Sequence, residues 1–284
     1  MAANLFKELS TPLEPISTGI AAKLKKLEDI RAVIFDIYGT LEISGTGDIS
    51  IAQSIDRESE LRAILNSNGY KQSLGQSLSE TFYKLVQQDH EGSRQNGAQF
   101  PEVDILEIWK RFFQVATGKV PSTGKLAKIA VQFECAVNPV WPMPEWLRTL
   151  GELKSSSKHI GIVSNAQFYT PLMLEGFSGK SLTELGFEGD LSIWSYQEGL
   201  GKPSVELFEK LKKALAVHSI TPSQTLYVGN DMLNDIWTAN QVGLKTALFA
   251  GDKRSLRLRD NDDRCNGLEP DVILTQLVDL SKVL

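Results

Sequence analysis

The stretch Ala32-Val33-Ile34-Phe35-Asp36-Ile37-Tyr38-Gly39-Thr40 decides the fold of this chain. Its four leading apolar residues predict a short buried strand, which places the carboxylate of Asp36 at the carboxyl end of that strand. Open α/β sheets bind their ligands at this end of their strands. The turn at Gly39-Thr40 leaves backbone N–H groups that can receive an anion. The stretch therefore suggests a nucleophile beside an anion-binding loop, although an Asp in this position can also simply cap a turn.

Three further segments follow the first one in a recognisable order. They are Ile160-Gly161-Ile162-Val163-Ser164-Asn165, then Gly201-Lys202-Pro203, then Leu226-Tyr227-Val228-Gly229-Asn230-Asp231-Met232-Leu233-Asn234-Asp235. Together the four segments resemble those of the haloacid dehalogenase-like (HAD) hydrolase superfamily. The resemblance covers roughly residues 28 to 45 and 140 to 250, and it is specific for the superfamily rather than for a substrate.

The resemblance implies an α/β fold, in which a Rossmann-like core with a doubly wound parallel sheet carries an inserted, mainly helical cap domain. We therefore expect a cap at residues 46–138. Apolar residues at loosely helical spacing, interrupted by Pro12 and Pro15, predict an N-terminal arm at residues 1–27. The core then consists of residues 28–45 and 139–284.

The residue pattern within the predicted cap is helical. Apolar residues three and four positions apart predict helices over 51–67, 77–90 and 103–117. The polar, Gly-containing segment 91–98 predicts a loop, with Arg94 as a solvated charge.

Strands and helices alternate after the cap. The pattern predicts helices at 144–153, 204–215 and 235–242, and strands at 160–163, 225–228, 246–249 and 272–274. Such alternation implies a parallel sheet with right-handed crossovers. The carboxyl ends of the strands then share one edge, where Asp36, Ser164 and Asp231 can meet.

The resemblance also implies roles for individual residues. Asp36 takes the place of the nucleophile, while Ser164 and Lys202 take those of the groups that hold the substrate anion. Tyr38 lies where a further catalytic side chain is found. The implied substrate-binding residues are Gly39, Thr40 and Asn165, and the implied Mg²⁺ ligands are Asp36, the Tyr38 carbonyl, Asn230, Asp231 and Asp235.

Two of these positions depart from the usual pattern of the superfamily. Many Mg²⁺-dependent relatives carry Asp where this chain has Asn230, so either Asp231 replaces it or the metal site is weakened. Phosphatases usually carry Asp in place of Tyr38 as the general acid, and a phenol with an ordinary pKa of about 10 is a poor substitute. Alternatively, Tyr38 packs under the cap.

The segment Asp-x-Tyr-Gly-Thr is similar to that of 2-haloacid dehalogenases, whose halide leaving group needs no proton. Other positions oppose that interpretation, because the cap segment Thr81-Phe82-Tyr83-Lys84 has no Arg and Met232 replaces the Asn of dehalogenases. The leading hypothesis is a Mg²⁺-dependent phosphatase that uses an Asp nucleophile on a small phosphorylated metabolite. The alternatives are a metal-independent 2-haloacid dehalogenase, and a HAD-like binding or regulatory protein with weakened catalysis.

Composition narrows the class of protein further. The 284 residues carry a net charge of −5 and no long Lys/Arg cluster, which argues against nucleic acid and membrane partners. No run reaches the roughly 18 apolar residues of a membrane span. Cys135 and Cys265 show no metal-binding spacing, and His90, His159 and His218 belong to no catalytic constellation. We expect a cytoplasmic enzyme for a small anionic molecule, with no signal for its oligomeric state.

Overall fold

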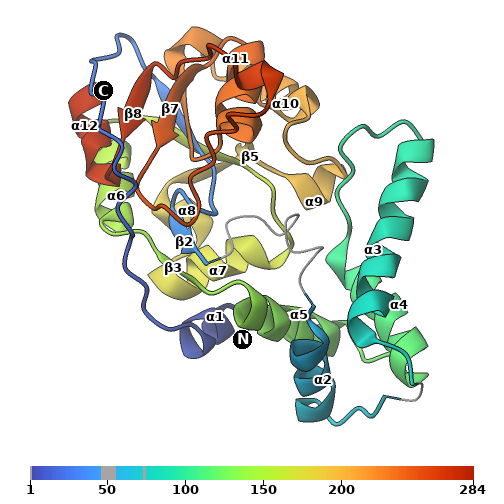
Figure 1. The fold of residues 1–284 in the computed structure, drawn as a ribbon. Coiled ribbons are helices and arrows are strands. Elements are labelled where there is room, and N and C mark those ends of the chain that lie inside the picture. The colour runs from blue at the N-terminus through green and yellow to red at the C-terminus, as the bar shows by residue number, and fades with distance from the viewer. Residues whose placement is uncertain (1, 46–55, 73–74) are drawn as a thin grey trace.

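The core of the computed structural model, which describes residues 2–45, 56–72 and 75–284, is a six-stranded sheet (Figure 1). In spatial order its strands are β5 (Phe187–Trp194), β4 (His159–Ser164), β1 (Ala32–Phe35), β6 (Thr225–Gly229), β7 (Lys245–Phe249) and β8 (Val272–Leu274). Every neighbouring pair is parallel. The predicted doubly wound α/β core is therefore confirmed.

Both faces of the sheet are buried, and β1 shows how. Val33 and Phe35 belong to a hydrophobic cluster that continues into the cap, whereas Ala32 and Ile34 join a second cluster together with α10. A strand covered on both sides needs apolar residues at every position, which explains the continuous apolar run. The core helices are α6 (Trp146–Ser155), α7 (Tyr169–Ser178), α8 (Leu182–Leu185), α9 (Ser195–Glu198), α10 (Val205–Val217), α11 (Thr238–Gln241) and α12 (Leu280–Val283).

The cap lies to one side of the sheet (Figure 1). The chain leaves the core through β2 (Glu42–Ser44) and returns through β3 (Val140–Pro142), and these two strands pair antiparallel. The helices between them are α2 (Glu58–Ser67), α3 (Leu78–Gln95), α4 (Ile105–Thr117) and α5 (Thr123–Val137). The start of the predicted cap and of its first helix, 46–55, lies outside the described residues.

The boundary of α3 differs from the prediction. This helix continues to Gln95, so the predicted loop 91–98 is wrong for its first five residues. Arg94 lies in the last helical turn, where a cation interacts favourably with the helix dipole. Asn96 is the C-cap residue, and the following Gly97 adopts a left-handed φ of 95°. The sequence pattern also did not predict α5.

The N-terminal segment packs along the core. The helix α1 (Ala2–Leu9) contacts α5 and α7, and its Phe6 is fully buried. Further along, Lys23 forms a β-bridge with Ile273, and the Leu27 N–H donates to the Val283 carbonyl.

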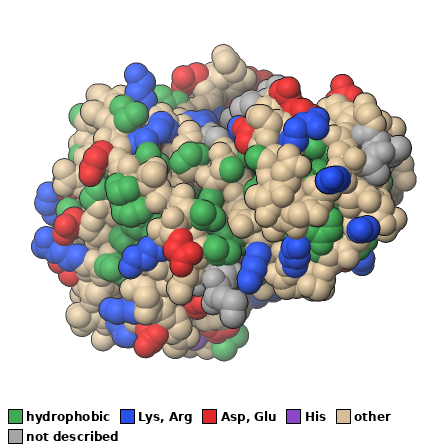
Figure 2. Space-filling model, turned by 90° about the horizontal axis from the view of Figure 1, so that it is seen from below, with side chains coloured by type: hydrophobic (Ala, Val, Ile, Leu, Met, Phe, Trp, Pro, Cys, Tyr) green, Lys and Arg blue, Asp and Glu red, His purple; other side chains and the backbone are tan. Residues whose placement is uncertain are grey.

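Charges of both signs are interspersed on the face shown in Figure 2, with hydrophobic side chains in small groups between them. Among the described helices, none combines the length and the apolar character that crossing a bilayer requires.

The strands β4 and β5 approach each other closely at Gly161. A Cβ atom there would lie 2.3 Å from the Leu191 carbonyl oxygen and 2.8 Å from Ile34 Cδ1. We therefore expect Gly161→Ala to lower the free energy of unfolding by about 1–3 kcal/mol, measured by urea denaturation. Gly151→Ala is the matched control, because no atom lies within 4 Å of its Cβ position in α6. Equal stability of the two variants would contradict this close approach.

Candidate active site

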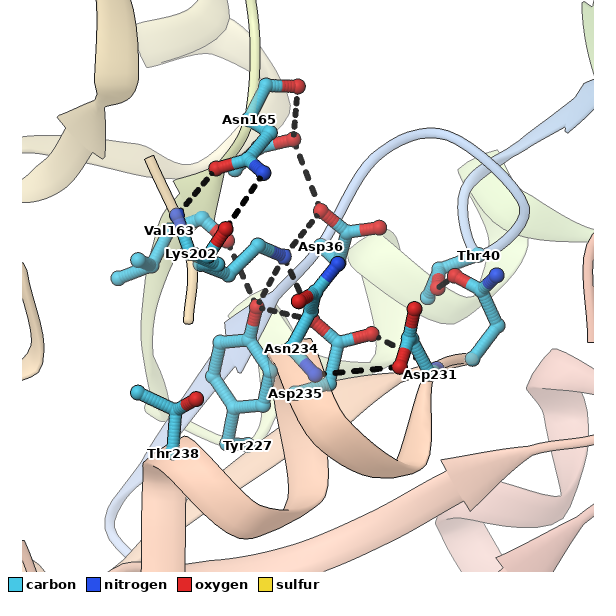
Figure 3. Close-up of polar contacts among 12 residues, drawn as sticks. Asp36, Thr40, Val163, Asn165, Lys202, Tyr227, Asp231, Asn234, Asp235 and Thr238 are labelled. Carbon is cyan, nitrogen blue, oxygen red and sulfur yellow. Dashed lines mark hydrogen bonds and ion pairs between the residues drawn. The ribbon is translucent and has the colours of Figure 1, made fainter. Parts of the chain in front are cut away.

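The predicted site residues converge at the carboxyl edge of the sheet (Figure 3). Asp36 follows β1, Ser164 ends β4, and Asp231 lies just beyond β6. Lys202 comes from the segment between α9 and α10. Its Nζ donates to Asp36 Oδ1 at 2.7 Å, and Ser164 Oγ donates to the same oxygen at 2.8 Å. Residues from three motif segments therefore meet at one carboxylate oxygen.

The Lys202 ammonium uses all three of its N–H groups inside the protein. Besides Asp36, it donates to Asp235 Oδ1 at 2.5 Å and to the Tyr227 hydroxyl at 3.0 Å. Burial alone would lower the pKa of Lys202, but the carboxylates of Asp235 and Asp36 raise it above its ordinary value. Lys202 therefore stays charged at physiological pH.

Asp235 links Lys202 to the end of β6. Its Oδ2 accepts a hydrogen bond from the Asp231 N–H at 2.9 Å, while burial raises its pKa to about 6 against the opposing effect of Lys202. The segment Met232–Trp237 is a π-helix, so the α-helix predicted to start at Asp235 begins only at Thr238. This wide turn carries the Asp235 side chain back against Gly229, where a Cβ would lie 2.4 Å from Asp235 Cγ.

The second carboxylate oxygen of Asp36 faces a cavity. Among the described residues no group donates a hydrogen bond to Oδ2, and Asp36 lines a cavity of about 530 Å³ between core and cap. The cap side of this cavity is partly aromatic and includes one arginine. Its residues are Phe82, Tyr83, Val86, His90 and Arg94. The space can therefore hold a small anionic molecule against Asp36.

Asn165 holds the segment that carries Lys202. Its carboxamide oxygen accepts from the Lys202 N–H at 2.6 Å, and its nitrogen donates to the Lys202 carbonyl at 3.2 Å. Asn165 also lines the cavity. The side chain that is predicted to bind substrate therefore also fixes the backbone of Lys202.

Three other predicted site residues brace the turn after β1. Gly39 has a φ of 86°, and a Cβ there would lie 2.6 Å from Asn230 Nδ2. Thr40 is fully buried and donates to Asn230 Oδ1 at 3.1 Å. Asn230 Nδ2 in turn donates to the Ser255 carbonyl at 2.6 Å. Both ends of the Asn230 amide are therefore engaged by protein groups.

Tyr38 reaches the cavity with its ring, but its hydroxyl is paired with Thr170 Oγ1 at 3.0 Å. Burial, followed by the nearby Glu134 carboxylate, raises the pKa of Tyr38 well above its ordinary value. The phenol is therefore an even weaker acid than a tyrosine in water.

Asp231 is held by two kinds of donor. Its Oδ1 accepts from the N–H groups of Leu233 and Asn234 at 2.9 and 3.1 Å. Arg259 adds Nε at 3.0 Å and Nη2, which donates to Oδ2 at 2.5 Å. Arg259 has a left-handed φ of 57°, which is uncommon for a residue with a side chain.

Sequence reasoning missed Arg259 and Tyr227. Tyr227 has the appearance of one more apolar strand residue, and Arg259 belongs to a basic stretch that shows no motif. Their partners, Lys202 and Asp231, become neighbours only in the folded chain.

The oxygen atoms at this edge fit Mg²⁺ in their chemistry. Mg²⁺ is held by one or two carboxylates and keeps several waters. Asp36 offers its Oδ2 and Asp231 offers a carboxylate, which it would have to share with Arg259. The oxygens of Asp36, Asp231 and Asp235 do not gather within 4.8 Å of one another, so the three carboxylates do not form a single cage.

A sequence model of haloacid dehalogenase-like hydrolases matches residues 30–243 of this chain. The glyceraldehyde 3-phosphate phosphatase of Methanothermobacter thermautotrophicus is 26% identical over 253 residues, which cover 86% of this chain and 95% of that protein. The ribulose-1,5-bisphosphate 5-phosphatase of Halopiger xanaduensis is 26% identical over 225 residues, 79% of this chain and 86% of that protein.

Solved structures agree with this fold. A 2-haloacid dehalogenase from Pseudomonas syringae pv. Tomato superposes with a TM-score of 0.56 at 21% identity, covering 89% of this chain and 97% of that one. A HAD phosphatase from Thermococcus onnurineus gives 0.52 at 18% identity, with the same coverage of both chains. Since the family match spans most of the sequence, the chain belongs to the haloacid dehalogenase-like hydrolases.

Proposed function

We propose that this hydrolase is a phosphatase that uses Asp36 as its nucleophile and Mg²⁺ as its cofactor, and acts on a small phosphorylated metabolite. The observation that carries the proposal is that the two carboxylate oxygens of Asp36 have different surroundings. Asp36 Oδ1 is held by Lys202 and Ser164, while Oδ2 faces the cavity. Both relatives at 26% identity are named as phosphatases, one of glyceraldehyde 3-phosphate and one of ribulose-1,5-bisphosphate, which favours a phosphorylated substrate over a 2-haloacid.

In the first step Asp36 Oδ2 attacks phosphorus, so a bond to the carboxylate forms as the bond to the leaving oxygen breaks. The leaving oxygen departs as an anion that water protonates. In the second step water attacks the phosphorus of the acyl phosphate, which releases inorganic phosphate and restores the Asp36 carboxylate. Lys202 and Ser164 hold Oδ1 throughout, so the nucleophile keeps its orientation.

The metal ligands in this proposal are Asp36, the Tyr38 carbonyl and Asp231. Bound Mg²⁺ would supply positive charge to the phosphoryl oxygens. Asp235 serves as the partner of Lys202, and Asn230 braces the turn at Gly39, so neither acts as a ligand.

Cavity composition indicates the substrate class. Arg94 lines the cap side of the cavity, and Lys202 and Arg259, each paired with carboxylates, line the core side, so both sides of the cavity include a basic side chain. The Tyr38 hydroxyl cannot serve as an effective acid, because its pKa is raised. Substrates with acidic leaving groups, such as acyl phosphates, are therefore favoured.

One observation supports metal-independent 2-haloacid dehalogenation as a second candidate. Arg259 already neutralises Asp231, which removes part of the need for a cation at this edge. This arrangement would suit a nucleophile that attacks carbon without a metal.

The main prediction concerns Asp36→Asn. We expect it to reduce phosphate release by more than about 1000-fold, because the attacking oxygen is lost. The substrates are p-nitrophenyl phosphate, acetyl phosphate, sugar phosphates and 2-chloropropionate, each with Mg²⁺ and with EDTA. Asp260→Asn is the control, since Asp260 is exposed. Halide release that survives EDTA would establish the dehalogenase. If the unmutated protein released neither phosphate nor halide from any of these substrates, a binding protein would be favoured.

Tyr38→Phe distinguishes two possible roles of the Tyr38 hydroxyl, a general acid or a structural partner of Thr170. Removal of a general acid usually costs about 100-fold or more with poor leaving groups. We expect instead a change in kcat of less than about 3-fold, and the same for alkyl and p-nitrophenyl phosphates, because the hydroxyl only binds Thr170. Tyr196→Phe controls for loss of a half-buried phenol. A loss confined to the alkyl esters would make Tyr38 the acid.

Asn230→Asp places a carboxylate at the usual ligand position of the superfamily. Its second oxygen would face the Ser255 carbonyl, now 2.6 Å from Nδ2, so two acceptors would meet without a proton. We expect the variant to lose about 1–3 kcal/mol of unfolding free energy and to gain no Mg²⁺ affinity. Urea denaturation and Mg²⁺ titration test both expectations, with the exposed Asn240→Asp as control. Tighter Mg²⁺ binding would show that position 230 faces the metal.

A further inference from the structure

Two of the three histidines lie together at the edge of the sheet opposite the active site. His159 begins β4, Glu188 lies on β5, and His218 directly follows α10. Their side chains are 30%, 32% and 23% exposed, so each is reachable from solvent but held by its surroundings. His159 is separated from Ser164, at the catalytic end of the same strand, by about 16 Å at about 3.3 Å per residue.

An irregularity in β5 places the carboxylates of Glu188 and Asp190 near the two histidines. Ile160 is paired with Phe187, but Ile162 is paired with Ser192, so five residue steps of β5 run beside two of β4. The extra residues bulge outward, and they include Glu188 and Asp190. Gly161 permits the bulge, because a Cβ there would lie 2.3 Å from the Leu191 carbonyl. Bulges commonly redirect side chains in this way.

The spacing of the three facing groups suits a small tetrahedral cation. His159 Nδ1 lies 3.1 Å from Glu188 Oε2, and His218 Nδ1 lies 3.8 Å from the same oxygen. One ligand atom from each of the three residues lies within 4.8 Å of the other two. Ligands at about 2.0–2.1 Å from tetrahedral Zn²⁺ are about 3.3 Å apart, which falls between the two measured distances.

A second carboxylate orients one of the imidazoles. Asp190 Oδ2 lies 2.7 Å from His218 Nε2, on the side of the ring away from Glu188. A neutral His218 with its proton on Nε2 donates to Asp190 and presents the Nδ1 lone pair to the other two groups. Carboxylate–histidine pairs of this kind support many metal sites.

We propose that His159, Glu188 and His218 form a binding site for Zn²⁺ or a similar divalent transition metal. Two imidazoles and one carboxylate make a donor set that such metals prefer, whereas Mg²⁺ selects oxygen ligands. The fourth position is left to water. A bound ion would join the start of β4, the bulge of β5 and the end of α10, so its effect is on the stability of this edge and is independent of the proposed phosphatase chemistry.

The same residues also allow a simpler arrangement, in which protonated imidazoles form ion pairs with Glu188 and Asp190. A metal titration separates the two, because only the metal site requires both ring nitrogens that face Glu188 to be unprotonated.

The test uses the full chain, stripped of metal with EDTA and titrated with ZnCl₂ in excess Mg²⁺. Three histidines give three Cε1–H signals in a ¹H–¹³C spectrum, so each can be followed. We expect one equivalent of Zn²⁺ to shift the signals of His159 and His218 and to leave His90 unchanged. The melting temperature should rise in the same titration.

His159→Gln and His218→Gln should each weaken Zn²⁺ binding by at least about 10-fold, the lower limit for loss of a ligand or its support. His90→Gln in the cap is the matched control, and Cys265→Ser tests for binding at the half-buried thiol. Phosphate release should stay unchanged in His218→Gln. Equal Zn²⁺ affinity in the unmutated protein and His218→Gln, or Zn²⁺ shifts spread over all three histidines, would overturn the proposal.

Discussion

The buried ammonium of Lys202 is the interaction on which the rest of the active edge depends. A cation in this position is tolerated only because Asp36 and Asp235 lie on either side of it and the Tyr227 hydroxyl accepts its third hydrogen bond. Loss of one partner from such a group leaves an uncompensated buried charge, which is strongly destabilising. The four motif segments are therefore bound together by electrostatics as well as by the sheet that carries them.

The three carboxylates at this edge, those of Asp36, Asp231 and Asp235, have different partners. Asp235 is tied to Lys202 and to the Asp231 backbone, and the π-helical turn after β6 places it there. Asp36 keeps one oxygen toward the cavity because the other accepts both Lys202 and Ser164. Asp231 is shared between a helix terminus and Arg259. The Asp231 carboxylate is therefore already engaged by an arginine.

The two ends of β4 carry separate clusters of polar side chains. Ser164, at its carboxyl end, contacts Asp36, and His159, at its amino end, belongs to the cluster with Glu188 and His218. A parallel sheet makes this separation natural, since all its strands point the same way and the helices return the chain along both faces. The close contact at Gly161 lies between the two ends and allows the β5 bulge to pass.

The sequence by itself determined the α/β class, the inserted helices and the four segments that form the active edge. These are local patterns: a continuous apolar run is needed wherever a strand is buried on both faces, and a carboxylate follows such a run at Asp36. Tertiary structure alone decided the contacts made by those side chains. Arg259 pairs with Asp231, Asn230 braces Thr40, and the β5 bulge brings Glu188 to two histidines far away in the chain. Each of these depends on packing between distant segments, and such contacts leave no periodicity or spacing in the sequence for pattern analysis to detect.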